Sequence, residues 1–268
     1  MINKILFPAE FAPYDRITYR YVYELAKYFE AEVVVMHSYA AVAALGRGDD
    51  NERMAEVFEK LNEFVDENTP AEFKSLSIDR FAENDYGADG ILKVAKRENV
   101  DLIITSMESE VNPGITNMSD HVLTLIRRSD IPVLAVPPSA TYHSFKKMVF
   151  STNFEFDDLL TINFLKEWAE AIDSEVHILH ILKDKNSVKE AARMDALIKA
   201  YSGQKGLTFD FVSGEKVIDS IETFTEAINA DLAVFTTHKR GLLGRLLEPS
   251  VTQKMAKKLH VPILVIKS

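Results

Sequence analysis

The sequence predicts an α/β fold of two tandem doubly wound domains, because an internal repeat and a strand–helix alternation run through the chain. The offset between matching residues is 143 at the start and falls to 130 later, so the second copy is 13 residues shorter. The clearest matches join residues 4–7 to 147–150 and residues 131–134 to 261–264. Short apolar runs alternate with longer amphipathic stretches, which is typical of βαβ units with right-handed crossovers. We expect each copy to be a parallel sheet flanked by helices, with one domain over 1–140 and the other over 141–268.

Ten apolar runs are expected to be strands, five in each copy. Residues 33–36 (VVVM) and 102–104 (LII) are continuously apolar, as in parallel strands that are covered on both faces. The expected strands span residues 4–8, 32–38, 74–81, 101–106 and 132–136 in the first copy, and 147–151, 175–181, 207–212, 231–236 and 262–266 in the second.

The stretches between these runs are expected to be helices. Apolar side chains recur at helical spacing after the first strand of each copy, at Ile17, Tyr21 and Leu25 and at Ile162, Leu165 and Trp168. Residues 51–68 predict a long helix with an acidic outer face, and residues 46–50 before it predict a mobile loop. In sheets of this kind, ligands bind beyond the carboxyl ends of the strands, near the point where the strand order reverses.

Composition and charge exclude several classes of protein. Of the 268 residues 47% are hydrophobic and 27% are charged, which argues against intrinsic disorder. Cysteine is absent, so disulfides, thiolate metal sites and cysteine nucleophiles are excluded. The net charge of −10 falls entirely in the first copy, and an acidic chain is a poor binder of nucleic acid. No apolar run is long enough for a membrane span or a signal peptide, so the expected location is the cytoplasm.

Three segments together resemble the universal stress protein family in its tandem two-domain form. They are the opening strand and loop at 4–11 (KILFPAEF), the Asp-Leu pair that leads the fourth strand at 101–102, and residues 238–266. The last segment resembles the family's His-centred loop, its helix opening with Ser-Val, and its closing Pro-Val-Leu-Val strand. The resemblance implies a five-stranded parallel sheet in each domain, pairing through the last strand and a role in surviving stress. Some members of the family bind ATP or AMP, and others do not.

The nucleotide-binding members share a loop spaced Gly-x2-Gly-x9-Gly-Ser/Thr, whose glycines let backbone N–H groups approach phosphates. Here the spacing survives, but all three glycines are replaced in both copies. The four positions hold Ser106, Ser109, Ser119 and Asp120 in the first copy, and Thr236, Lys239, Pro249 and Ser250 in the second. Added side chains hinder close approach of the backbone, and proline has no N–H to donate. We therefore predict degenerate nucleotide sites.

The two altered loops differ in charge. Glu108, Glu110 and Asp120 give the first loop three carboxylates, which repel a polyphosphate. The second loop carries cations that could hold an anion, with Ser250 as a helix cap. The candidate anion or nucleotide site of the C-terminal domain comprises Asn153, Thr236, His238, Lys239, Arg240, Arg245 and Ser250, with ATP or AMP as the ligand. The competing interpretation, which we favour, is that these cations belong to a solvated turn.

The first-strand loop of binding members ends with an aspartate that contacts the nucleoside, and this chain has Glu10 and Asn153 at those positions. Either could hold a ribose hydroxyl, and Asn153 is favoured as a helix cap. His37 and His180 occupy equivalent strand ends, where a structural role is favoured over metal binding or acid–base chemistry. Ser151 and Thr152 have no evident base beside them, and no catalytic or metal-binding motif occurs.

The functional prediction is a non-catalytic stress-response protein that acts through protein contacts, with an unidentified protein partner. The alternative is a sensor that binds ATP, AMP or another anion in the C-terminal domain. A nucleotide hydrolase would need a metal or a positioned base, and the sequence offers neither. The apolar last strands, 131–136 and 261–266, would be exposed edges, so we expect them to pair antiparallel as an intramolecular pseudo-dimer. A homodimer is left open, and no nucleic-acid or membrane partner is expected.

Overall fold

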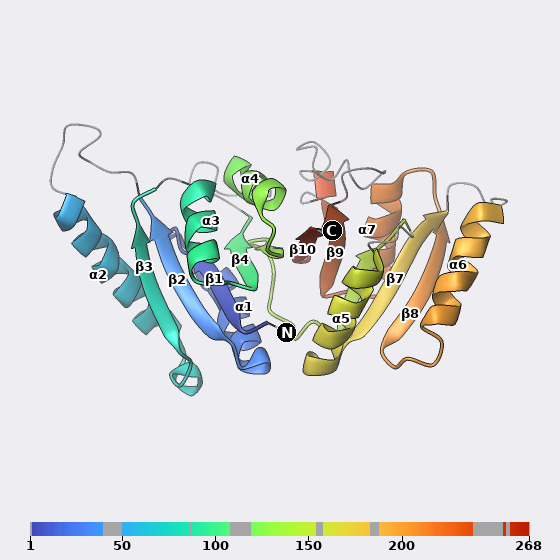
Figure 1. The fold of residues 1–268 in the computed structure, drawn as a ribbon, viewed down its shortest axis with the longest axis horizontal. Helices are drawn as coiled ribbons and strands as arrows, with labels where there is room; N and C mark the ends of the chain where they lie inside the picture. Colours follow the sequence, from blue (N-terminus) through green and yellow to red (C-terminus); the bar gives the residue numbers. More distant parts are fainter. Residues whose placement is uncertain are drawn as a thin grey trace. The chain divides into compact units, whose positions relative to one another are not determined.

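The chain divides into two compact units, Met1–Tyr142 and His143–Ser268 (Figure 1). The computed structural model describes residues 2–39, 50–85, 87–107, 119–153, 158–182, 188–237, 254–255 and 258–267, with the side chains of 188–191 left out. The mobile loop predicted over residues 46–50 lies, except for Asp50, outside the described residues.

The N-terminal unit is a parallel sheet with strand order β3-β2-β1-β4-β5. Its strands are β1 (Lys4–Pro8), β2 (Glu32–Ser38), β3 (Ile78–Glu83), β4 (Leu102–Ser106) and β5 (Val133–Val136). Its helices are α1 (Asp15–Phe29), α2 (Asp50–Asn68), the short 3-10 helix η2 (Ala71–Phe73), α3 (Ala88–Arg97) and α4 (Asp120–Arg128). Right-handed crossovers place α1 and α2 on one face of this sheet and α3 and α4 on the other.

The C-terminal unit repeats this order as β8-β7-β6-β9-β10, again with parallel pairing. Its strands are β6 (Lys147–Ser151), β7 (Glu175–Leu182), β8 (Leu207–Ser213), β9 (Leu232–Thr237) and β10 (Ile263–Lys267). Its helices include α5 (Asp158–Ile172), α6 (Val188–Ala200) and α7 (Val217–Ala227). The predicted fold class, two doubly wound domains in tandem, is confirmed.

The third strand differs most from its predicted bounds, whereas the others agree to within one residue at each end. It was expected over residues 74–81, but β3 begins at Ile78. Pro70 has extended backbone angles and starts η2, whose Phe73 is buried against the ring of Tyr23 (4.5 Å between ring centroids). Residues 74–77 then turn before the strand begins. Packing of this aromatic pair therefore ends the segment before the strand in η2 and a turn, and the strand starts four residues later than predicted.

The Asp-Leu pair that leads the fourth strand has a structural role in both units. Asp101 Oδ2 accepts hydrogen bonds from the backbone N–H groups of Asn3 (2.8 Å) and Lys4 (3.1 Å). Asp231 Oδ2 accepts the equivalent bond from the N–H of Lys147 (3.0 Å). Each aspartate thus satisfies donors at the amino end of the unit's first strand, and this contact fixes β4 beside β1 and β9 beside β6.

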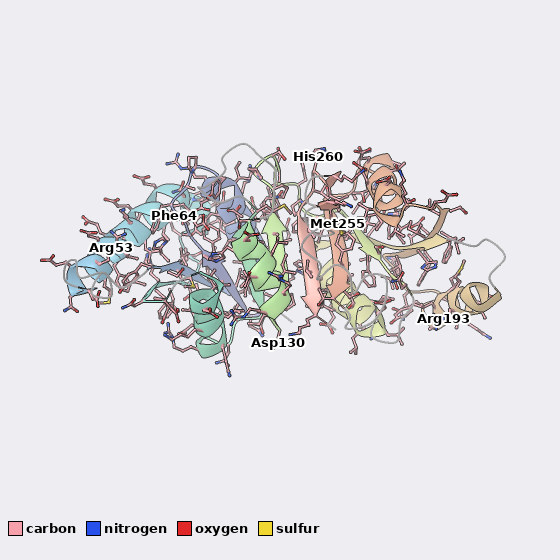
Figure 2. All side chains as sticks on the ribbon, turned by 90° about the horizontal axis from the view of Figure 1, so that it is seen from above. Arg53, Phe64, Asp130, Arg193, Met255 and His260 are labelled. Carbon is pink, nitrogen blue, oxygen red and sulfur yellow. The ribbon has the colours of Figure 1, made fainter. Side chains whose placement is uncertain are left out.

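The cores of both units contain large aromatic side chains. In the N-terminal unit, Phe64 of α2 lies over Phe7 and Tyr19, with ring centroids 6.0 and 5.2 Å away. Figure 2 labels Arg53 toward the outer end of α2 and Phe64 farther along the same helix. In the C-terminal unit, Trp168 is 2% exposed. Phe64 therefore packs α2 against the sheet together with the buried Val57, Leu61 and Val65 of the same helix.

Candidate functional site

The carboxyl edge of each sheet is where a doubly wound fold binds ligands, at the point where the strand order reverses. This switch point lies between β1 and β4 in the N-terminal unit and between β6 and β9 in the C-terminal unit. The structure describes six of the predicted site residues: Glu10, Ser106, Ser119, Asp120, Asn153 and Thr236. The other six lie outside the described residues: Ser109, His238, Lys239, Arg240, Arg245 and Ser250.

A buried carboxyl, Asp15, lies at the switch point of the N-terminal unit. It is the first residue of α1 and has 0% exposure. Its Oδ2 accepts hydrogen bonds from the backbone N–H groups of Glu10 (2.7 Å) and Ala12 (3.3 Å) in the β1–α1 loop. Its Oδ1 accepts a hydrogen bond from the hydroxyl of Ser106 (3.0 Å), the last residue of β4. One carboxyl therefore joins the β1–α1 loop to the end of β4.

The hydroxyl of Ser106 has a second buried partner. Its Oγ lies 2.8 Å from Thr18 Oγ1, and either oxygen can be the donor. Both side chains are turned into the domain, with Ser106 6% and Thr18 1% exposed. Glu10 lies at the rim, where its Oε2 accepts a hydrogen bond from the Tyr14 hydroxyl (2.8 Å). Ser106, which stands at the first altered glycine position, therefore directs its hydroxyl into the domain, where it forms hydrogen bonds with Asp15 and Thr18.

Burial controls the electrostatics of this cluster. Loss of water raises the pKa of Asp15 to about 7, because the hydrogen bonds from the Glu10 backbone and the Ser106 hydroxyl offset burial only in part. The negative charge of Glu10 also raises this pKa, although by less. Asp15 is therefore an acid that changes its charge near neutral pH.

The C-terminal unit has an equivalent cluster around Asp158, the counterpart of Asp15 at the offset of 143. Asp158 has 0% exposure, and its Oδ2 accepts a hydrogen bond from the hydroxyl of Thr152. Its Oδ1 accepts a hydrogen bond from the hydroxyl of Thr236 (3.2 Å), which is the counterpart of Ser106. Thr152 stands where the first copy has Ala9. Both copies therefore have a buried acid that accepts a hydrogen bond from a hydroxyl at the end of the fourth strand.

Neither aspartate was predicted to be a site residue. The sequence did carry a signal, because the internal repeat maps Asp15 onto Asp158. An acid near the start of an amphipathic helix is ordinarily assigned to the solvent-exposed face, so the repeat alone did not show that it is buried. Thr236 and Ser106 were identified through the glycine spacing, and the structure brings each of them to one of these carboxyls.

The remaining described candidates have other surroundings. Ser119 caps α4, because its Oγ accepts a hydrogen bond from the N–H of Val122 (3.3 Å). Asp120 is exposed and lies in the first turn of that helix, where its negative charge interacts favourably with the helix dipole. Asn153 is half-buried, and the residues it was expected to cap lie outside the described part of the chain. The assignment of these residues to a degenerate nucleotide site stays a prediction.

The two equivalent histidines contact the first-strand loops through their ring nitrogens. His37 Nδ1 lies 2.7 Å from the carbonyl oxygen of Ala9, and His180 Nδ1 lies 2.8 Å from that of Thr152. A ring N–H donated to a carbonyl fixes the tautomer and holds the loop against the neighbouring strand. Burial lowers the pKa of His37, which keeps this ring neutral. Both contacts agree with the structural role that was favoured.

Thr152 does have a carboxylate beside it, contrary to the expectation that no base accompanies this residue. A hydroxyl bonded to a carboxylate is the arrangement of an activated nucleophile. Thr152 is 1% exposed, however, and Asp158 is 0% exposed, so a substrate cannot reach either group in this conformation. Thr152 and Asp158 therefore form a structural hydrogen bond in the interior of the domain.

Within the described ranges, no three side chains of histidine, aspartate or glutamate gather to form a metal site. No helix in the same ranges is both long and apolar enough to cross a membrane.

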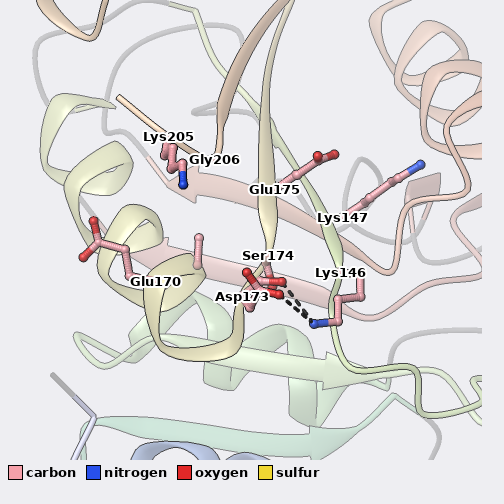
Figure 3. Close-up of a pocket in the computed structure, with 9 residues that line it drawn as sticks. Lys146, Lys147, Glu170, Asp173, Ser174, Glu175, Lys205 and Gly206 are labelled. Atoms are coloured by element: carbon pink, nitrogen blue, oxygen red, sulfur yellow. Dashed lines mark hydrogen bonds and ion pairs between the residues drawn. The ribbon is translucent and has the colours of Figure 1, made fainter. Parts of the chain in front are cut away.

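An open depression of about 530 Å³ lies at the opposite, amino edge of the C-terminal sheet (Figure 3). Lys146 lines it, and its Nζ donates to the carbonyl oxygens of Ile172 (3.3 Å) and Asp173 (3.1 Å). This lysine thereby satisfies acceptors at the carboxyl end of α5. The depression contains as many acidic as basic side chains and is remote from the switch point, so it does not form the candidate site.

Comparisons with known proteins agree on the fold. The model of the universal stress protein family matches residues 1–137 and again residues 145–267. A universal stress protein from Archaeoglobus fulgidus DSM 4304 is 18% identical, with 100% of this chain and 99% of that chain covered and a TM-score of 0.73. The cytoplasmic domain of a prokaryotic cation chloride cotransporter is 10% identical, with 99% and 95% covered and a TM-score of 0.55.

A universal stress protein solved in complex with cAMP is 17% identical, with 46% of this chain and 98% of that chain covered and a TM-score of 0.36. Among curated proteins, none matches this chain.

Proposed function

Because the chain belongs to the universal stress protein family, we propose that it is a non-catalytic member that acts in the stress response through contacts with a protein partner. The proposal includes a cytoplasmic location and altered nucleotide loops in both domains. The observation that supports it most is the inward bonding of Ser106 and Thr236, which stand at the first glycine position of the loop.

The geometry of the N-terminal switch point argues against a nucleotide there. Two backbone N–H groups of the β1–α1 loop already donate to Asp15, so they are not free for an anion. The carboxylates of Glu10 and Asp120 add negative potential at the same edge of the sheet. A phosphate group would meet neither free donors nor positive charge from these residues.

A second candidate function is supported by the difference in charge between the two copies. Lys239, Arg240 and Arg245 stand where the first copy has Ser109, Glu110 and Ile115, so a C-terminal sensor of ATP, AMP or another anion is the alternative. Cationic side chains can replace lost backbone donors in holding a phosphate.

Isothermal titration of the full chain with ATP and with AMP separates these functions. We expect no binding heat with either nucleotide. Heat that disappears in Lys239→Glu would support the sensor and contradict the altered-loop proposal for the C-terminal domain. Heat that persists in Lys239→Glu and increases in Asp120→Lys, which replaces a repelling carboxylate with a cation, would contradict it for the N-terminal domain.

We also propose that the last strands, β5 and β10, pair with each other inside one chain. Trp168 is the only tryptophan and lies in the C-terminal unit, so its fluorescence reports unfolding of that unit alone. Replacing Val133 in β5 with lysine is expected to lower the urea midpoint that Trp168 reports, because paired strands couple the two units. A tryptophan transition identical to that of the wild type would contradict the pairing. Ile263→Lys is the reciprocal variant, read through the N-terminal tyrosines.

A further inference from the structure

We propose that Asp15 is a reversible proton-binding site inside the folded N-terminal domain, and that Asp158 is its counterpart in the C-terminal domain. The proton is the ligand of this site, and its uptake changes the charge of the switch point without opening the domain. This inference goes beyond the proposed function, because it requires neither a protein partner nor a nucleotide.

The surroundings of Asp15 suit a neutral acid as well as a carboxylate. The carboxyl has 0% exposure, and its hydrogen-bond partners are two backbone amides and one hydroxyl, all uncharged. Within the part of the chain that the structure describes, Asp15 forms no ion pair with a lysine, arginine or histidine. A buried carboxylate without a cation is costly, so the neutral form is favoured more than it is in water.

The hydrogen-bond chain from Asp15 through Ser106 to Thr18 can reverse its direction. In the ionised state, Thr18 donates to Ser106, and Ser106 donates to Asp15 Oδ1. When Oδ1 is protonated, Asp15 donates to Ser106, and Ser106 donates to Thr18, across the same distances of 3.0 and 2.8 Å. Oδ2 accepts from the two loop amides in both states. Proton uptake therefore keeps both hydrogen bonds of the chain, and Thr18 changes from donor to acceptor toward Ser106.

The titratable groups on neighbouring elements set the direction in which Asp15 responds. Glu10 on the β1–α1 loop carries a negative charge that favours the neutral form of Asp15, and Tyr14 is bonded to Glu10. His37 at the end of β2 reaches the same loop through the Ala9 carbonyl, and burial keeps it uncharged. Asp120 follows β4 at the start of α4 and adds a further negative charge at this edge. Burial raises the pKa of Asp15 in agreement with this geometry.

The duplication repeats the buried acid in the second domain. Asp158 is equally buried and accepts hydrogen bonds from the hydroxyls of Thr152 and Thr236. The shared features are the buried acid and a hydroxyl from the end of the fourth strand, Ser106 or Thr236.

The test is a pH titration of the side-chain carboxyl carbons by NMR on full-length protein labelled at aspartate. Asp15→Asn and Asp158→Asn assign the two resonances, and both variants keep the shape of the neutral acid. We expect the Asp15 carbon to titrate near pH 7. A midpoint near pH 4, in the ordinary range of aspartate, would overturn the proposal.

Two neighbouring variants separate proton binding from a purely structural role. Ser106→Ala removes a donor that favours the carboxylate, so the midpoint of Asp15 is expected to rise by a measurable fraction of a pH unit or more. Thr105→Ala is the matched control, because successive side chains of a strand point to opposite faces and Thr105 does not contact Asp15. A midpoint that Ser106→Ala leaves unchanged, or that Thr105→Ala shifts equally, would contradict the hydrogen-bond chain as the proton site.

Discussion

Replacing Asp15 with asparagine is expected to stabilise the N-terminal domain at pH 8, by about 4 kcal/mol more than it does at pH 4. Asparagine can accept the amides of Glu10 and Ala12 with its oxygen and donate to Ser106 with its nitrogen, as the neutral acid does. The substitution therefore keeps these hydrogen bonds and removes the buried charge, and the second N–H that the amide adds has the same effect at every pH. Most substitutions at buried positions destabilise a protein, so a gain at alkaline pH has a distinctive sign.

The sign follows from the direction of the pKa shift. The pKa of Asp15 is about 7 in the folded protein, against a model value of 3.8. Between these values the folded state holds a proton that the unfolded state has released, so the wild-type free energy of unfolding falls as the pH rises. The loss is complete about one pH unit above the folded pKa, and asparagine at the same position does not titrate. The difference between variant and wild type therefore grows from pH 4 to about pH 8 and then becomes constant.

Urea unfolding at several pH values measures this difference. Eight of the nine tyrosines lie in the N-terminal unit, so tyrosine fluorescence follows that unit, while Trp168 follows the other. Glu83→Gln is a control of opposite sign. Burial alone would raise the pKa of Glu83, but hydrogen bonds from Lys93 and Arg97 lower it, so its contribution to stability is lost as the pH falls. Parallel pH profiles for wild type and Asp15→Asn would contradict a raised pKa at Asp15.

Truncating Phe64 to alanine is expected to lower the free energy of unfolding of the N-terminal domain by about 4 kcal/mol. Phe64 is 8% exposed, and its ring contacts those of Phe7, Phe11 and Tyr19. Its removal would leave a cavity between α2 and the sheet at the base of the β1–α1 loop.

The same tyrosine signal and urea titration measure this loss. Glu63→Ala is the matched control, because the neighbouring side chain on the same helix is exposed, and a change within about 0.5 kcal/mol is expected. A loss below about 1 kcal/mol in Phe64→Ala would show that α2 is held to the sheet by other contacts.

The candidate site could be predicted only in part from the sequence. Glycine spacing identified Ser106 and Thr236, because a backbone site for phosphate imposes a pattern of residue types at fixed separations. It could not indicate that their hydroxyls turn inward, since the side-chain direction depends on an acceptor from a different element. Asp15 and Asp158 were aligned by the repeat, but their burial depends on how the first helix of each domain packs at the strand ends.

The sequence by itself determined the tandem architecture. The alternation of apolar runs and amphipathic stretches can be seen along the chain, and the two copies align with each other near both of their ends. It also determined the Asp-Leu pairs, whose aspartates cap the first strand in both units. Only the tertiary structure decided the start of β3 and the burial of the two acids. Burial and hydrogen bonding join residues 91 positions apart in the case of Asp15 and Ser106, and no local pattern carries that information.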